Sequence, residues 1–210
     1  MTFLEMQTEL EGILLDSSPT IVAGIPSYIN DAVQQIAEDI KFPELRQVTA
    51  VTTSTSTYYV NMPATWSSRL LYAGNLDGEY KVLDEGLLEL IRLFPSLDEA
   101  GDIQYIACEG GILYYQPIPA TAVSITCIGY HVPDTLVSDS DTPSFIPSYL
   151  QREAIVNKAA AIGYSIIEAG TEGEKVNTSL FTSLAGIGLN KIREYVSRRR
   201  PVTCTSNWSV

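Results

Sequence analysis

The sequence contains one histidine, His131, so any catalytic triad of the hydrolase type would have to use it as the base. His131 lies in a proline-flanked segment, and the sequence holds no G-x-S-x-G motif that would place a serine nucleophile on a strand–turn–helix elbow. The glycine-rich phosphate-binding motifs of nucleotide-binding proteins are also absent. We therefore interpret His131 as a lone surface or loop histidine and expect no enzymatic activity.

Metal binding is equally poorly supported. Three cysteines, Cys108, Cys127 and Cys204, are widely spaced without a C-x-x-C pair, which favours neither a zinc site nor a disulfide framework. Cys108 and Cys127 fall in apolar strand patterns and are expected to be small core residues. The segment 138–142 contains two aspartates but lacks the glycine and the bidentate glutamate of a calcium loop. It is predicted to be a capping or Asx-turn segment, and we expect no metal and no cofactor.

The charge is strongly acidic: 25 acidic against 13 basic residues give a net charge of −12. This excess argues against nucleic acid or an anionic membrane surface as the main partner. Residues 191–200 are the exception, because they hold five bases and one acid. The carboxylate pairs Asp84-Glu85 and Asp98-Glu99 are expected to lie on a solvated surface. Without a long apolar run or a basic leader, the chain is expected to be soluble and unsecreted.

Two short amphipathic helices are predicted at the N-terminus. Thr2 is a plausible N-cap for the first, and an apolar stripe follows at spacings of three and four: Phe3, Met6, Leu10 and Ile13. The second is predicted to open at Ile25-Pro26 and to run to about Ile40, because proline is favoured in the first helical turn. Together they form an αα-hairpin.

From Gln47 to about Gly129 the residues favour strands. Predicted strands cover 48–54, 58–62, 70–72, 80–83, 103–108, 112–115 and 123–130, with one short helix over 87–94. The sequence Glu109-Gly110-Gly111 predicts a tight hairpin, because glycine adopts the positive φ that such a turn needs. This is a β module of roughly 85 residues.

The stretch 129–154 is predicted to be an ordered, extended crossing between the strands and the last helices. Its prolines restrict their own φ and move the preceding residues away from the helical region. Four residues are expected to anchor the β module to the helices: Tyr130, Pro133, Leu136 and Phe145.

Two further helices are predicted after Pro147. The first, to about Ile166, has apolar residues on more than one side and should be buried on several faces. The second is expected to be capped by Asn177 or Thr178 and to carry one broad apolar stripe: Leu180, Phe181, Leu184, Ile187, Ile192 and Tyr195.

The expected fold class is α+β: a four-helix core of two N-terminal and two C-terminal helices, an inserted antiparallel β module and an extended C-terminal arm. The expected boundaries are 1–46 for the αα-hairpin, 47–130 for the β module, 131–197 for the crossing and C-terminal helices, and 198–210 for the arm. From Val202 the arm alternates in a way typical of a strand that adds to another protein's sheet edge, with Trp208 as anchor, although a frayed terminus explains the composition equally well.

Several segments occur in a specific order. They are Ile29-Asn30-Asp31-Ala32, Tyr58-x-Val60-x-x-Pro63, the run from Ile112 to Pro119, Tyr130-x-x-Pro133-x-x-Leu136, and Ser140-Asp141-Thr142 with Pro147 before an alanine-rich helix. In this order, from about residue 25 to 195, the chain resembles the head-to-tail adaptor proteins of tailed bacteriophages. The stretch 84–102 departs from that family because it is longer and more helical.

The resemblance implies a structural virion protein of the phage neck that assembles in the host cytoplasm. Such adaptors form a ring, usually dodecameric, below the portal; the ring joins head to tail and continues the channel through which DNA passes without specific binding. It implies an arm that reaches into the portal, carried here by Arg198, Arg199, Arg200, Val202, Cys204, Trp208 and Val210. Contacts between subunits are expected on the C-terminal helices, at Leu150, Ala154, Ala161, Leu180, Leu184 and Ile187.

Two alternatives remain open. Within the virion, the chain could be a tail-completion or stopper protein that meets the connector from the tail side. Outside that class, it could be a carbohydrate-binding β module carried on helices, because Tyr58, Tyr59, Tyr114 and Tyr115 form two adjacent pairs, and one of each pair should face out of its strand.

Overall fold

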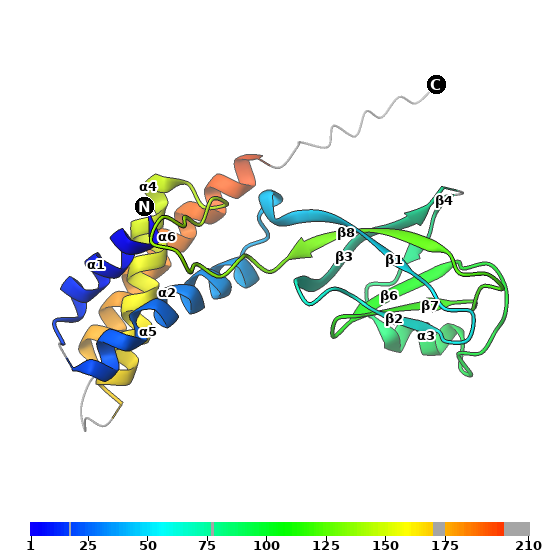
Figure 1. The fold of residues 1–210 in the computed structure, drawn as a ribbon, viewed down its shortest axis with the longest axis horizontal. Coiled ribbons are helices and arrows are strands. Elements are labelled where there is room, and N and C mark those ends of the chain that lie inside the picture. The colour runs from blue at the N-terminus through cyan, green and yellow to red at the C-terminus, as the bar shows by residue number, and fades with distance from the viewer. Residues whose placement is uncertain (17, 77, 170–174, 200–210) are drawn as a thin grey trace. The chain divides into compact units, whose positions relative to one another are not determined.

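The structure, a computed structural model, describes residues 1–16, 18–76, 78–169 and 175–199. The chain is divided into two units: residues 1–42 with the chain from 133 onward, and residues 43–132. The first unit is built of helices and the second mainly of strands (Figure 1). The class is therefore α+β, as expected.

The helical unit is organised around one central helix. Its helices are α1 (Phe3–Leu14), α2 (Pro19–Asp39), α4 (Ser148–Gln151), α5 (Asn157–Ile167) and α6 (Val176–Arg199), with a π-helical segment, η2 (Arg152–Val156), joining α4 to α5. The segment formed by η2 and α5 contacts α1, α2 and α6. Three consecutive residues of η2 are buried, Ala154, Ile155 and Val156, so this helix is buried on several faces, as predicted.

The first helix begins as its sequence predicts. The Thr2 side chain accepts a hydrogen bond from the Glu5 amide (3.2 Å), and the Glu5 carboxylate accepts one from the Thr2 amide (2.8 Å). This reciprocal capping box satisfies two amides that lack partners within the helix. Phe3, Met6 and Leu10 are buried, and Leu14 rather than Ile13 completes the stripe.

The predicted start of α2 at Ile25-Pro26 is wrong. The helix begins at Pro19, and Pro26 lies inside it. Pro19 occupies the first helical turn, where its missing amide costs nothing. The helix passes through Pro26 because its buried stripe already starts at Ile21 and continues through Ile25 and Ile29, so packing outweighs the lost backbone hydrogen bond.

The predicted cap of α6 is also wrong, and of the predicted stripe only Ile192 is buried. Asn177 and Thr178 lie inside the helix, and the Glu168 carboxylate caps it instead: it accepts hydrogen bonds from both amides (3.1 and 3.2 Å) and from the Thr178 hydroxyl (2.7 Å). The residues that α6 buries include two small ones, Ala185 and Gly188, beside Leu189, Ile192 and Val196. Small side chains permit close approach to η2, a contact that the spacing of the large apolar residues does not reveal.

The second unit is a sandwich of two four-stranded sheets. The first has the order β1 (Arg46–Thr52), β8 (Ser124–His131), β3 (Trp66–Asn75), β4 (Gly78–Glu79), and the second the order β2 (Tyr59–Asn61), β7 (Ile112–Gln116), β6 (Tyr105–Glu109), β5 (Lys81–Val82). A short 3₁₀ turn, Pro43–Leu45, precedes β1. All strand pairs are antiparallel except β5 with β6.

Side chains from both sheets form the core of this unit. Tyr115 and Ile125 are fully buried there, and Cys127 is too, which confirms its predicted core role. Burial raises the pKa of the Cys127 thiol to about 12. The hairpin between β6 and β7 turns at Gly110 and Gly111, whose φ values of 60° and 76° confirm the predicted turn.

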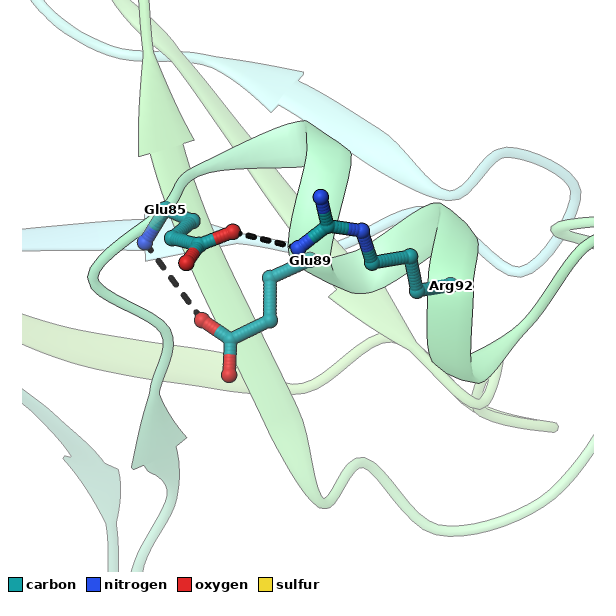
Figure 2. Close-up of polar contacts among 3 residues, drawn as sticks. All are labelled: Glu85, Glu89 and Arg92. Carbon is teal, nitrogen blue, oxygen red and sulfur yellow. Dashed lines mark hydrogen bonds and ion pairs between the residues drawn. The ribbon is translucent and has the colours of Figure 1, made fainter.

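A short helix, α3 (Leu87–Leu93), covers the second sheet where the sequence predicts a helix. Leu90 and Phe94 pack with Leu83 and Ala107 beneath it. At its start, the Glu85 amide donates to the Glu89 carboxylate (3.4 Å), and Arg92 donates to the Glu85 carboxylate (2.6 Å), as Figure 2 shows. The pair is well exposed, so it stabilises the helix only slightly.

Candidate interaction surfaces

His131 is not a surface or loop residue, so that prediction is wrong. It lies in β8, 5% exposed, and its ring stands edge-on to Trp66 with centroids 5.1 Å apart. Its two nitrogens lie within hydrogen-bonding distance of the Thr49 (3.3 Å) and Thr65 (3.2 Å) hydroxyls. Desolvation lowers the pKa of His131. No serine or cysteine nucleophile is among these partners, so the arrangement is that of a core histidine with satisfied nitrogens.

The segment 138–142 acts as a structural turn. The Asp141 carboxylate accepts hydrogen bonds from the Val137 and Ser138 amides (both 2.8 Å), which lower its pKa. The carbonyls of Asp139 and Asp141 accept the Leu4 and Phe3 amides at the start of α1 (3.2 and 2.8 Å). The predicted capping role is therefore confirmed. Within the described residues, no three side chains of the metal-binding types converge.

An exposed apolar stripe of the helical unit lies on α6. Val176, Leu180, Leu184 and Ile187 are 61%, 50%, 36% and 55% exposed and recur at spacings of three and four, so they share one face of the helix. We call these four residues the outer face of α6. Because the opposite side of α6 packs on η2 and α5, this face has no partner within the part of the chain that the structure describes.

The other residues expected at subunit contacts lie deeper. Leu150 and Ala154 are buried by the chain's own helices (4% and 0% exposed), and Ala161 is half-buried. On α6, a methyl group at Gly188 would lie 2.6 Å from the Glu153 carbonyl oxygen. Of the six expected contact residues, only Leu180, Leu184 and Ile187 present substantial apolar surface.

The arm begins later than its sequence suggests, because α6 continues through Arg198 and Arg199. Arg198 forms an ion pair with Glu194 one turn earlier, and the Arg199 guanidinium lies 4.7 Å from the centre of the Tyr195 ring. These residues border a cleft of about 380 Å³ against Tyr149. The remaining arm residues lie outside the described residues: Arg200, Val202, Cys204, Trp208 and Val210.

The four expected anchors divide between the two units. Tyr130 is buried in the β unit, where its hydroxyl accepts hydrogen bonds from Arg46 (3.3 Å). Pro133, Leu136 and Phe145 are buried in the helical unit. There the Asn30 side chain bonds both the amide and the carbonyl of Leu136 (2.8 and 3.1 Å), and the Phe145 ring meets Phe42 edge-on at 4.8 Å.

The paired tyrosines of the β unit form an exposed cluster. Tyr114 and Tyr58 are stacked, with ring centres 6.2 Å apart, and Tyr59 contacts both. Tyr115 faces the core instead, where its hydroxyl bonds the backbone of Ser54. One tyrosine of the second pair therefore faces outward, as predicted, whereas both of the first pair keep exposed surface.

One further surface has no clear signal in the sequence. Strand β1 lies at the end of its sheet, and most of its residues are exposed, including Val48 at 69%. The sequence predicts the strand itself, but its position at the edge follows from the order in which strands pair within the sheet. A run of seven strand residues without lysine, acid or proline was the only available hint.

Comparison with known proteins bears on the function of these surfaces. No helix in the ranges described above is long and apolar enough to span a membrane. The search of curated proteins found no match. The model of one protein family, SU10 adaptor protein, matches residues 1–202. Because the match covers nearly the whole sequence, the chain belongs to the SU10 adaptor family of bacteriophage head-to-tail adaptor proteins.

Proposed function

We propose that this adaptor is a structural, non-catalytic protein that forms a ring below the portal, joins the phage head to its tail and continues the DNA channel. The observation that carries the proposal, beyond family membership, is the outer face of α6: an apolar stripe on a long helix with no partner in the described chain. A ring of identical subunits buries such a face against a different surface of the next copy. Dodecameric assembly is part of the proposal.

The energetics favour association through this face. Burying the exposed half of one leucine or isoleucine contributes about 1 kcal/mol, so the outer face of α6 supplies a few kcal/mol per contact. The helical unit supports the outer face of α6. In this proposal α1, α2, α5 and α6 act as one four-helix block that holds this face rigid. The net charge of −12 disfavours phosphate binding and suits a channel through which DNA slides.

The ring is tested by placing charges on the outer face of α6. The double variant Leu180→Glu, Ile187→Glu should lose ring formation on the cognate portal in native mass spectrometry and cryo-imaging, and heads should accumulate without tails. Leu88→Glu on α3 is the matched control, because Leu88 and Ile187 are both 55% exposed. Circular dichroism verifies that both variants fold. Rings of normal size from the double variant would overturn the proposal.

The arm is tested separately. A chain that ends at Ser197 should still form the helical unit but should bind the portal more weakly than the full chain. A photo-crosslinker at Trp208 should capture the portal protein. Capture of a tail-side protein instead would favour the stopper role and refute portal binding by the arm.

A further inference from the structure

The outer edge of β1 is an open strand edge of unusual length for this molecule. β1 has seven residues and ends the first sheet, whereas the other edge strands, β2, β4 and β5, have three, two and two. β1 pairs with β8 without interruption from Arg46↔Tyr130 to Thr52↔Ser124. By contrast, β3 pairs with β8 through register shifts. β1 is therefore a regular template, without a register shift, along its whole length.

The backbone groups on that edge can be assigned from one hydrogen bond. Just beyond β1, the Thr53 amide donates to the Val123 carbonyl (2.9 Å), which continues the β1–β8 ladder. Amides in an antiparallel strand alternate between facing the partner and facing away. Val51, Thr49 and Gln47 therefore face β8. The residues whose amides and carbonyls face outward are Arg46, Val48, Ala50 and Thr52, and all four are exposed.

The protections that a strand's own residues can supply are missing from β1. Natural edge strands are blocked by lysine, inward-facing charge, proline, bulges or covering loops. β1 has no lysine, acid, proline or bulge, and its only charge is Arg46 at one end. On the outer face of the sheet, exposed Val48 lies opposite Ile128, and Ala50 opposite Thr126. In a chain with 25 acidic residues, this uncharged strip is suited to contact with another backbone.

We propose that β1 binds an extended segment of a tail-side neck protein by β-strand addition, an inference that rests on the proposed ring. A second copy of β1 cannot be the occupant in a ring, because joining two identical edges creates a two-fold axis and closes a dimer. The other edges of the chain, of two or three residues, are too short to cover β1. The chain's own arm, if it paired in parallel, would bring its basic start to Arg46, a like charge.

The segment that fits has a defined chemistry. Its backbone pairs with Val48, Ala50 and Thr52, and alternate side chains that are aliphatic or β-branched cover Val48 and Ile128. An acidic residue at the end that meets Arg46 completes the match.

Hydrogen exchange measured on isolated protein and on purified necks tests the pairing residue by residue. The Val48, Ala50 and Thr52 amides should exchange rapidly in the isolated chain and become protected in complete necks. Thr49 and Val51 are the internal controls, because their amides face β8 and should be protected in both states. Unprotected Val48 and Ala50 amides in necks that contain the ring would overturn the inference and leave the ring intact. Absence of the ring in necks would instead refute the proposed function.

A proline at Ala50 tests the role of the edge. Ala50→Pro removes an outward-facing donor without removing a bond to β8, so the β unit should stay folded. Each lost backbone bond should weaken capture of the tail-side partner about threefold to tenfold. Ala50→Val keeps the amide and should bind normally. If Ala50→Pro rings form and retain tails as well as wild-type rings do, the inference is contradicted. A crosslink from position 50 to another copy of this chain would also contradict it.

Discussion

Gly188 and Gly186 lie two residues apart on α6, yet alanine should have opposite effects at the two positions. A methyl group at Gly188 would lie 2.6 Å from the Glu153 carbonyl oxygen, 2.7 Å from its carbonyl carbon and 2.8 Å from the Ala154 nitrogen. These are backbone atoms of η2 and cannot rotate away. At Gly186 no atom lies within 4 Å of the added methyl.

The magnitudes follow from these distances. Overpacking a tight contact costs about 1–3 kcal/mol, and three backbone contacts below 3 Å place Gly188→Ala at the upper end. Alanine gains about 1 kcal/mol over glycine within a helix. The net effect at Gly188 is about 2 kcal/mol of destabilisation, whereas Gly186→Ala should stabilise the helical unit by about 0.5–1 kcal/mol.

Urea unfolding followed by circular dichroism at 222 nm measures both effects. With a slope of about 2 kcal/mol per molar, the midpoint of the helical transition should fall by about 1 M for Gly188→Ala and rise by about 0.3–0.5 M for Gly186→Ala. If the Gly188→Ala protein were as stable as the Gly186→Ala protein, α6 would not approach η2 this closely. The assignment of Val176, Leu180, Leu184 and Ile187 to the outer face of α6 would then also fail.

Two further predictions concern titratable groups. The Glu168 carboxylate caps α6, and hydrogen bonds from Thr178 first and Asn177 second lower its pKa. The stability that this cap gives the helical unit is therefore complete above the usual carboxyl pKa range and is lost as pH falls through the lowered pKa. Glu168→Gln should therefore lower the urea midpoint at pH 7 and remove that part of the pH dependence, whereas equal midpoints for variant and wild type at pH 7 would refute the cap. Burial lowers the pKa of His131, so the unfolded chain binds more protons and the β unit should lose stability as pH falls below about 6.5. Near-ultraviolet circular dichroism of Trp66 follows this transition, and a His131→Gln protein with an unchanged acid slope would contradict it.

Local signals in the sequence predict most of the secondary structure. The Thr2 N-cap, the Gly110-Gly111 hairpin and the short helix over 87–94 are all confirmed, because each depends on residues close together in the sequence. The aspartates of 138–142 were also interpreted correctly as turn residues. Family membership was recognisable from the order of short segments along the chain.

The errors arise where packing outweighs local preference. Pro26 is tolerated inside α2 because apolar residues on both sides of it are buried, and Glu168, the C-cap residue of α5, replaces the expected cap of α6. His131 was assigned to the surface or a loop because its partners, Thr49 and Thr65, come from segments distant in sequence.

The sequence by itself determined the α+β class, with helical segments before and after a β module, and the order of its short segments indicated the adaptor family. The tertiary structure decided which surfaces are available for contact. The side of α6 that carries Ala185 and Gly188 packs against η2, so Leu180 and Ile187 remain exposed on another side. The order in which the strands pair leaves β1 at the edge of its sheet. Periodicity shows that a helix or strand has an apolar side, but which side is covered depends on neighbours brought together only by folding.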